Sequence, residues 1–109
     1  MNERTPRDSV VRREVVAEGT DVRVTIYTLT AGDSVRWHYH NEVTDDMIGM
    51  EGTTVVETRA PRNTYVLEPG QRCTIGPKTA HCVHGKDGGS CRYLVVQGVG
   101  NYDFMPVGG

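Results

Sequence analysis

Apolar and polar residues alternate one by one along several short stretches of the chain. The clearest stretch covers residues 22–29, where Val22, Val24 and Ile26 alternate with Arg23, Thr25 and Tyr27. A pleated strand imposes this period of two on its side chains, whereas a helix would not keep it. We therefore predict a β-strand over 22–29.

Eight further stretches have the same character, being short and rich in Val, Thr, Ile and Tyr. Turn sequences that contain Gly, Pro, Asn or Asp separate them. The additional predicted strands are residues 10–16, 35–40, 45–50, 53–58, 64–67, 72–75, 80–84 and 92–96. Short strands at such regular spacing predict an all-β sandwich or barrel with no long helix.

The chain length of 109 residues is typical of one domain. We expect a single domain over 1–109 with its core at about 10–104 and flexible termini, including a loose tail at 105–109. Hydrophobic residues make up 37% of the chain, so an open single sheet would bury too little apolar area to offset the loss of conformational entropy. Closure into a barrel, or dimerisation, is expected to supply the missing burial.

The charges argue against a nucleic-acid partner. Twelve Lys and Arg face fourteen Asp and Glu, and both signs are scattered along the chain. The polar N-terminal sequence and the lack of an 18-residue apolar run predict neither a signal peptide nor a membrane span. Cys73, Cys82 and Cys91 form no CxxC motif and cannot all pair within one chain, so we expect reduced thiols in a cytoplasmic protein.

Three of the four histidines form a pattern with chemical meaning. His38 and His40 lie two residues apart in a predicted strand, so both side chains project from one face and can reach one ion. Imidazole is a common ligand for Zn, Fe, Ni, Cu and Mn, and further ligands must come from elsewhere in the chain. Asp45 and His81 are the candidates for these further ligands.

The spacing around this pair resembles a known motif. Gly32, His38, His40, Asp45 and Gly52 have the intervals of the first motif of the cupin superfamily, in which the residues are Gly, His, His, Glu and Gly. The departure is Asp45, where the family usually has Glu.

A second cupin motif is expected further along the chain, and Gly70 to Gly85 keeps its intervals around His81. Gly76, Lys78 and Gly85 stand where the family has Pro, Gly and Asn. The resemblance covers residues 22–96 and is stronger in the first motif than in the second.

The resemblance implies a small double-stranded β-helix, a jelly-roll-like cupin barrel, with a metal ion bound between the two motifs. Carried over by position, His38, His40 and His81 are the imidazole ligands and Asp45 is the carboxylate ligand. Because Asp is one methylene shorter than Glu, its carboxylate falls short by about 1.5 Å unless the backbone shifts or a water intervenes. Glu42 and Asp46 are the neighbours that could replace it, although Asp46 points to the other face of a regular strand.

Because side chains alternate between the two faces of a strand, other residues can be assigned to the face of the predicted ligands or to the opposite face. Arg36 shares the face of His38 and His40, where it either binds an anionic substrate or sits at the barrel mouth with its head in water. Arg36 and Glu42 are the candidates for a catalytic role. Cys82 and His84 lie on the face opposite His81 and are outside the predicted ligand set.

A barrel with this ligand set suits a metal-dependent enzyme that acts on a small polar or carboxylate-bearing molecule. The cofactor would be one divalent transition-metal ion per chain, Fe, Zn, Mn or Ni, and a dioxygenase is slightly favoured over an isomerase or lyase. The alternatives are a non-catalytic module that binds a small ligand and a metal-free structural barrel. We further expect a homodimer that forms through the outer sheets or by exchange of the strand at 10–16.

Overall fold

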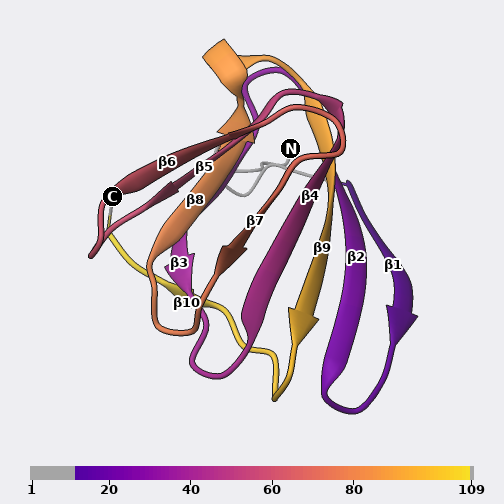
Figure 1. The fold of residues 1–109 in the computed structure, drawn as a ribbon, viewed down its shortest axis with the longest axis vertical. Coiled ribbons are helices and arrows are strands. Elements are labelled where there is room, and N and C mark those ends of the chain that lie inside the picture. Colours follow the sequence, from indigo (N-terminus) through magenta and orange to yellow (C-terminus); the bar gives the residue numbers. More distant parts are fainter. Residues whose placement is uncertain (1–11, 109) are drawn as a thin grey trace, which may run out of the picture.

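The computed structural model describes residues 12–108, which form two five-stranded antiparallel sheets facing each other (Figure 1). The strand orders are β1-β2-β9-β4-β7 and β10-β3-β8-β5-β6. The elements are β1 (Arg12–Glu18), β2 (Val22–Leu29), β3 (Ser34–Tyr39), β4 (Thr44–Gly52), β5 (Thr54–Thr58), β6 (Asn63–Leu67), β7 (Arg72–Ile75), β8 (His81–Gly85), the 3-10 turn η1 (Lys86–Gly88), β9 (Cys91–Gly98) and β10 (Met105–Pro106). The predicted all-β fold is confirmed.

Each of the nine predicted strands has a counterpart: those at 22–29 and 72–75 have the predicted ends, and the other seven differ by one or two residues at an end. The strand predicted at 10–16 corresponds to β1, which covers 12–18, and residues 10 and 11 lie outside the described part of the chain. Between residues 12 and 108, no helix is long and apolar enough to cross a membrane.

The inner face of the β1-β2-β9-β4-β7 sheet changes from polar to apolar along the barrel. At one end, cross-strand pairing aligns Arg23 of β2 with Gln97 of β9, and Gln97 with Asp45 of β4. Four residues further along β2, Tyr27 pairs with Tyr93, and their rings stack with centroids 5.3 Å apart. We call these the polar end and the apolar end of the barrel.

Strand β2 places its polar residues inside the barrel, the reverse of the usual pattern. Thr25 is 1% exposed, whereas Val22 on the alternate face is 37% exposed. Alternation along a strand can be read from the sequence, but which of its two faces turns inward depends on what the opposing sheet offers. The inward polar face of β2 therefore belongs to the interior of the barrel rather than to its surface.

Gly49 helps to close the apolar end. It shares the inward parity of Asp45 on β4, and a Cβ added to it would lie 2.8 Å from the carbonyl oxygen of Glu68 and 3.2 Å from that of Leu67. The backbone between β6 and β7 therefore approaches β4 so closely that only glycine fits without displacement. The missing side chain makes room for backbone and not for a ligand.

The chain after β9 is ordered, and the prediction of a loose tail at 105–109 is wrong for residues 105–108. Met105 and Pro106 form β10 and pair with Tyr39 and His38 of β3, and the amide of Val107 donates to the carbonyl of Trp37 at 3.0 Å. Without this segment β3 would present an unpaired edge. In Figure 1 the yellow C-terminal segment runs from the end of β9 across to the sheet that contains β3.

The three cysteines are free thiols, and all three are buried. Burial raises the pKa of Cys73 to about 11 and that of Cys82 to about 12. Cys73 and Cys91 belong to the apolar core cluster, whereas Cys82 does not. The thiol of Cys82 therefore has a different environment from the other two.

Candidate metal centre

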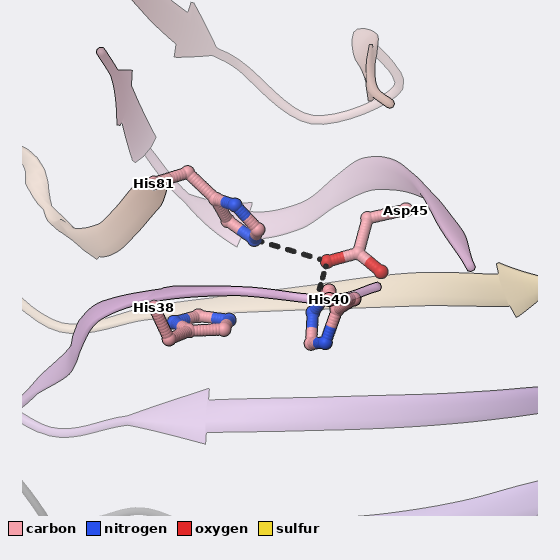
Figure 2. A group of neighbouring side chains, drawn as sticks. All are labelled: His38, His40, Asp45 and His81. Atoms are coloured by element: carbon pink, nitrogen blue, oxygen red, sulfur yellow. Dashed lines mark hydrogen bonds and ion pairs between the residues drawn. The ribbon is translucent and has the colours of Figure 1, made fainter. Parts of the chain in front are cut away.

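Three different strands bring the four predicted ligands together at the polar end. His38 lies in β3 and His40 directly follows it, Asp45 is the second residue of β4, and His81 begins β8. One nitrogen or oxygen from each side chain lies within 4.8 Å of the others, and all four residues are buried. Figure 2 shows His40 and His81 approaching one carboxylate oxygen of Asp45 from two sides, with the His38 ring beside them.

A bulge in β3 sets the position of His38. Val35 pairs with Val83 and His38 pairs with His81, so three steps along β3 correspond to two steps along β8. One extra residue in β3 keeps both Val35 and His38 on the inner side, because Val35 packs against the core and His38 faces His81. The bulge thus brings the two motifs into register across the barrel.

The Nδ1 atom of every imidazole in the group lies at a backbone carbonyl oxygen. The acceptors are Arg36 at 2.6 Å from His38, Asp103 at 2.6 Å from His40 and Thr79 at 2.8 Å from His81. A carbonyl can only accept, so each Nδ1 carries the proton and donates it. In the neutral rings this leaves the lone pair on Nε2, the atom available to a metal.

Asp45 reaches the histidines despite its short side chain. Its Oδ2 lies 3.2 Å from Nε2 of His40 and 3.1 Å from Nε2 of His81. Two ligands at right angles around an ion, each about 2.1 Å from it, lie about 3 Å apart, so this spacing fits a shared ion. The other oxygen, Oδ1, accepts a hydrogen bond from Nε2 of Gln97 at 3.1 Å, which orients the carboxylate.

Burial and neighbouring charge set the protonation of the group. Burial, reinforced by His81, lowers the pKa of His38 from 6.5 to about 3, so its ring is neutral. Burial opposes both the protonation of His40 and the ionisation of Asp45, but their mutual hydrogen bond outweighs it, and the pKa of His40 is raised while that of Asp45 is lowered. Asp45 is therefore a carboxylate.

This donor set fits a divalent transition-metal ion. Without a cation, Nε2 of His40 and Nε2 of His81 can both donate to the carboxylate oxygen only if both buried rings carry a second proton, and the two neighbouring positive charges oppose this. One ion would satisfy the carboxylate and all three lone pairs together. Three imidazoles and one carboxylate are ligands that Fe, Zn, Mn and Ni all accept.

The remaining sequence candidates do not join the group. Glu42 accepts a hydrogen bond from the backbone amide of Asn101 at 3.0 Å and is exposed, and Asp46 pairs with Thr74. Arg36 was predicted to share a face with His38 because side chains alternate along a regular strand, and the bulge in β3 interrupts this alternation. Among the described contacts, Arg36 meets the group through its backbone oxygen and not through its guanidinium.

The segment after β9 also belongs to the site, and sequence reasoning missed it. The Phe104 ring stacks on His38 with centroids 4.3 Å apart, and the Tyr102 ring lies 5.3 Å from that of His40. The backbone oxygen of Asp103 accepts from His40, and its side chain accepts from the backbone amide and the side chain of Asn41. The signal was present in the sequence, because the chain's single Phe stands beside Met and Val in this segment.

Gln97 was missed because the predicted strand ended at Val96, one residue too early. Its side chain joins two others at the polar end: it donates to Asp45, and its Oε1 accepts from Arg23 at 3.2 Å. The guanidinium of Arg23 also lies 3.8 Å from the centre of the Tyr102 ring. An arginine therefore lies close to the predicted ligands, as we expected for Arg36, but this arginine is Arg23.

The departure from the second motif at Gly85 has a local cause. A Cβ at this position would lie 1.8 Å from the carbonyl oxygen of Gly89, so the turn that follows β8 passes too close for any side chain. The motif position therefore holds glycine here because of the path of the turn, and His81 keeps its place four residues earlier.

The architecture and the site together define a double-stranded β-helix barrel with a His₃Asp group at its polar end. No family model matches the chain, and no curated protein matches its sequence. Solved structures match it well. A conserved protein with a double-stranded β-helix domain from Klebsiella pneumoniae has a TM-score of 0.78 at 19% identity, covering 96% of this chain and 90% of that one.

Two further solved structures are similar to this chain, and the description of one of them names the cupin superfamily. A cupin superfamily protein from Desulfitobacterium hafniense has a TM-score of 0.72 at 17% identity, covering 91% of this chain and 84% of that one. An oxalate oxidase has a TM-score of 0.78 at 21% identity, and the match covers 98% of this chain but 59% of the oxidase. The predicted cupin fold is confirmed, and at these identities the likeness concerns the fold alone.

Proposed function

We propose that this chain is a metal-dependent enzyme that uses one divalent transition-metal ion, Fe, Zn, Mn or Ni, held by His38, His40, Asp45 and His81. The observation that carries the proposal is the backbone carbonyl at every Nδ1, which leaves three Nε2 lone pairs beside one carboxylate. Prearranged donors of this kind are typical of metal sites, in which the second nitrogen of each histidine is hydrogen-bonded.

Such an ion, with coordination positions left open by four protein ligands, would supply Lewis acidity toward a carbonyl or enolate, or redox chemistry with O₂ if it is iron. The protein's own residues orient the ligands and limit water. Phe104 and Tyr102 cover two of the histidines, and Gln97 holds Asp45. A dioxygenase remains slightly favoured over an isomerase or lyase.

A carboxylate-bearing substrate is supported by two unpartnered polar atoms at the polar end. Nε of Arg23 and Oγ1 of Thr25 are buried and have no hydrogen-bond partner among the described residues. Both residues share the inward face of β2, and Arg23 is linked through Gln97 to the ligand Asp45. A carboxylate could accept from both donors and offset the cost of their burial. Similar structures include an oxalate oxidase and an oxalate decarboxylase, which is consistent with small acids.

The metal centre is tested by comparing wild-type protein, purified without added metal, with His38→Ala and His81→Ala. We expect both variants to lose the tightly bound ion. Glu51→Gln serves as a matched control, because Glu51 lies on the outer surface against Arg92. Tightly bound metal that is unchanged in both histidine variants would remove the centre.

Enzymatic activity is tested on the metal-loaded protein by screening O₂ consumption and product formation with small keto acids, diketones, sugar acids and oxalate. We expect turnover of at least one acid, with a KM that rises at least tenfold in Arg23→Leu. Tight binding of an acid without turnover would instead make the chain a ligand-binding module. A catalytic role for Arg36 or Glu42 stays a prediction.

Two further expectations concern the setting of the protein. We propose a homodimer, because Val15 and Val16 of β1 are 50% and 53% exposed and β1 ends its sheet within the described residues. Light scattering that returns the mass of one chain would overturn it. The three free thiols support a reducing, cytoplasmic setting.

A further inference from the structure

A second group of metal-binding side chains lies on the other side of β8. His81 points into the barrel, so strand alternation directs Cys82 and His84 to the outer face. Glu57 of β5 is the cross-strand partner of Cys82. One ligand atom from each of Glu57, Cys82 and His84 lies within 4.8 Å of the others. We call these three residues the outer cluster.

The histidine of the outer cluster is oriented like those of the inner group. Nδ1 of His84 lies 3.0 Å from the carbonyl oxygen of Gly85, which can only accept, so Nδ1 carries a proton. Nε2 then faces Oε2 of Glu57 at 2.6 Å. A nitrogen lone pair and a carboxylate oxygen this close need a positive charge between them, either a second proton on the ring or a cation.

The donor set of sulfur, nitrogen and oxygen suits a cation that binds all three, and the donors differ in their exposure to solvent. Cys82 is 9% exposed, whereas the side chains of His84 and Glu57 are 30% and 41% exposed. The thiol is therefore shielded from solvent, whereas the other two donors are partly exposed to water, which can complete the coordination shell. The guanidinium of Arg59 lies over the Trp37 ring at 3.9 Å and donates to the carbonyl oxygen of Gly108 at 2.7 Å, so this cation is already engaged elsewhere.

We propose that Cys82 Sγ, His84 Nε2 and a carboxylate oxygen of Glu57 form a second divalent-metal site, suited to Zn²⁺, with water as the remaining ligand. Sulfur, imidazole and carboxylate are the donors that zinc accepts, and a thiolate binds in place of the thiol. Donors around a tetrahedral zinc ion lie about 3.3–3.8 Å apart, so Glu57 and His84 would separate by about 1 Å. Both side chains border solvent and can make this movement. The site does not depend on the proposed enzymatic function.

The test is titration of the metal-free full chain with Co²⁺ and Zn²⁺, followed by thiolate-to-cobalt charge-transfer absorption. We expect wild type to bind two equivalents and to show the thiolate band. Cys82→Ser should bind one equivalent without the band, whereas His81→Ala should keep the band and bind its other equivalent roughly 100-fold more weakly. Cys73→Ser is the matched control, because Cys73 lies in the apolar core, and it should retain both equivalents and the band.

A second variant keeps the proposal falsifiable if Cys82→Ser does not fold. Glu57→Gln should weaken the thiolate-containing site at least tenfold while leaving the other equivalent unchanged. A wild-type protein that shows no thiolate band, whether it binds one equivalent or two, or a band that survives in Cys82→Ser, would overturn the proposal. Each of these results would make the outer cluster a simple ion pair of His84 and Glu57 beside a buried thiol.

Discussion

The inner group and the outer cluster share strand β8 but differ in how firmly their donors are held. In the inner group each of the three histidines has its Nδ1 at a backbone oxygen, and Gln97 fixes the carboxylate. In the outer cluster one histidine is held in this way, and the carboxylate of Glu57 is 41% exposed. Alternation along one strand thus supplies metal-binding residues to two environments.

The difference shows that burial and prior orientation, more than residue type, decide the strength of a metal site. Ordering an exposed carboxylate or imidazole costs conformational entropy when the ion binds, whereas the inner donors are already ordered. The inner group is therefore expected to bind the tighter ion. Four predictions test this difference between the two groups, in order of decreasing expected effect.

The largest effect concerns acid stability of the metal-free protein. The pKa of His38 is 6.5 when unfolded and about 3 when folded, so the unfolded chain binds the additional proton in this interval. Stability therefore falls as pH decreases from 6.5 toward 3, by on the order of 4 kcal/mol from this residue. Urea unfolding at several pH values, with a chelator present, measures it.

The matched pair for this experiment is His38→Phe and His84→Gln. The first should flatten the pH dependence, because the buried titrating ring is gone, and the second should preserve it. An equally steep dependence in His38→Phe would show that other groups cause the acid sensitivity.

The second prediction compares ligand removal on the two sides of β8. His81→Ala is expected to cost about 3 kcal/mol of binding free energy at the tight site, a loss of roughly 100-fold, because one of four ligands is removed. His84→Ala should leave that affinity within about twofold. Competition with a chromophoric chelator measures both, and equal losses would erase the distinction between the two groups.

The third prediction concerns the orientation of Asp45. Gln97→Leu removes the donor to Oδ1 and should weaken metal binding by about 10- to 100-fold while keeping all four ligands. Gln71→Ala, at an exposed glutamine in the turn before β7, is the control. Unchanged affinity in the leucine variant would mean that the ion alone orients the carboxylate.

The smallest effect is expected from Phe104, which stacks on His38 and is itself 38% exposed. Phe104→Ala should weaken metal binding about fivefold, or about 1 kcal/mol, and should speed removal of the ion by a chelator. Met105→Ala on the same segment should change neither value. A removal rate that is the same in both variants would show that Phe104 does not cover the inner group.

The sequence was sufficient to predict most strands and the four inner residues, because both depend on short spacings. His38 and His40 share a face through the period of two, and the motif intervals place Asp45 and His81 relative to them. The face on which Arg36 lies could not be predicted, because one extra residue in β3 interrupts the alternation and leaves no mark in the local sequence. The tail was mispredicted because Pro and Gly near a chain end suggest disorder, whereas an open strand edge was available to pair with it.

The sequence alone was sufficient for the features that depend on nearby residues: the alternation along strands, the turns and the two motif spacings. Together these features predict an all-β barrel and its inner metal-binding residues. Only the tertiary structure shows which face of β2 turns inward and which nitrogen of each histidine is free. It also shows that Asp45 reaches the histidines and that Glu57 lies beside Cys82 and His84. These features depend on register between strands and on contacts between segments far apart in the chain. Pairwise hydrogen bonds and packing in the folded barrel set that register, and no local pattern encodes it.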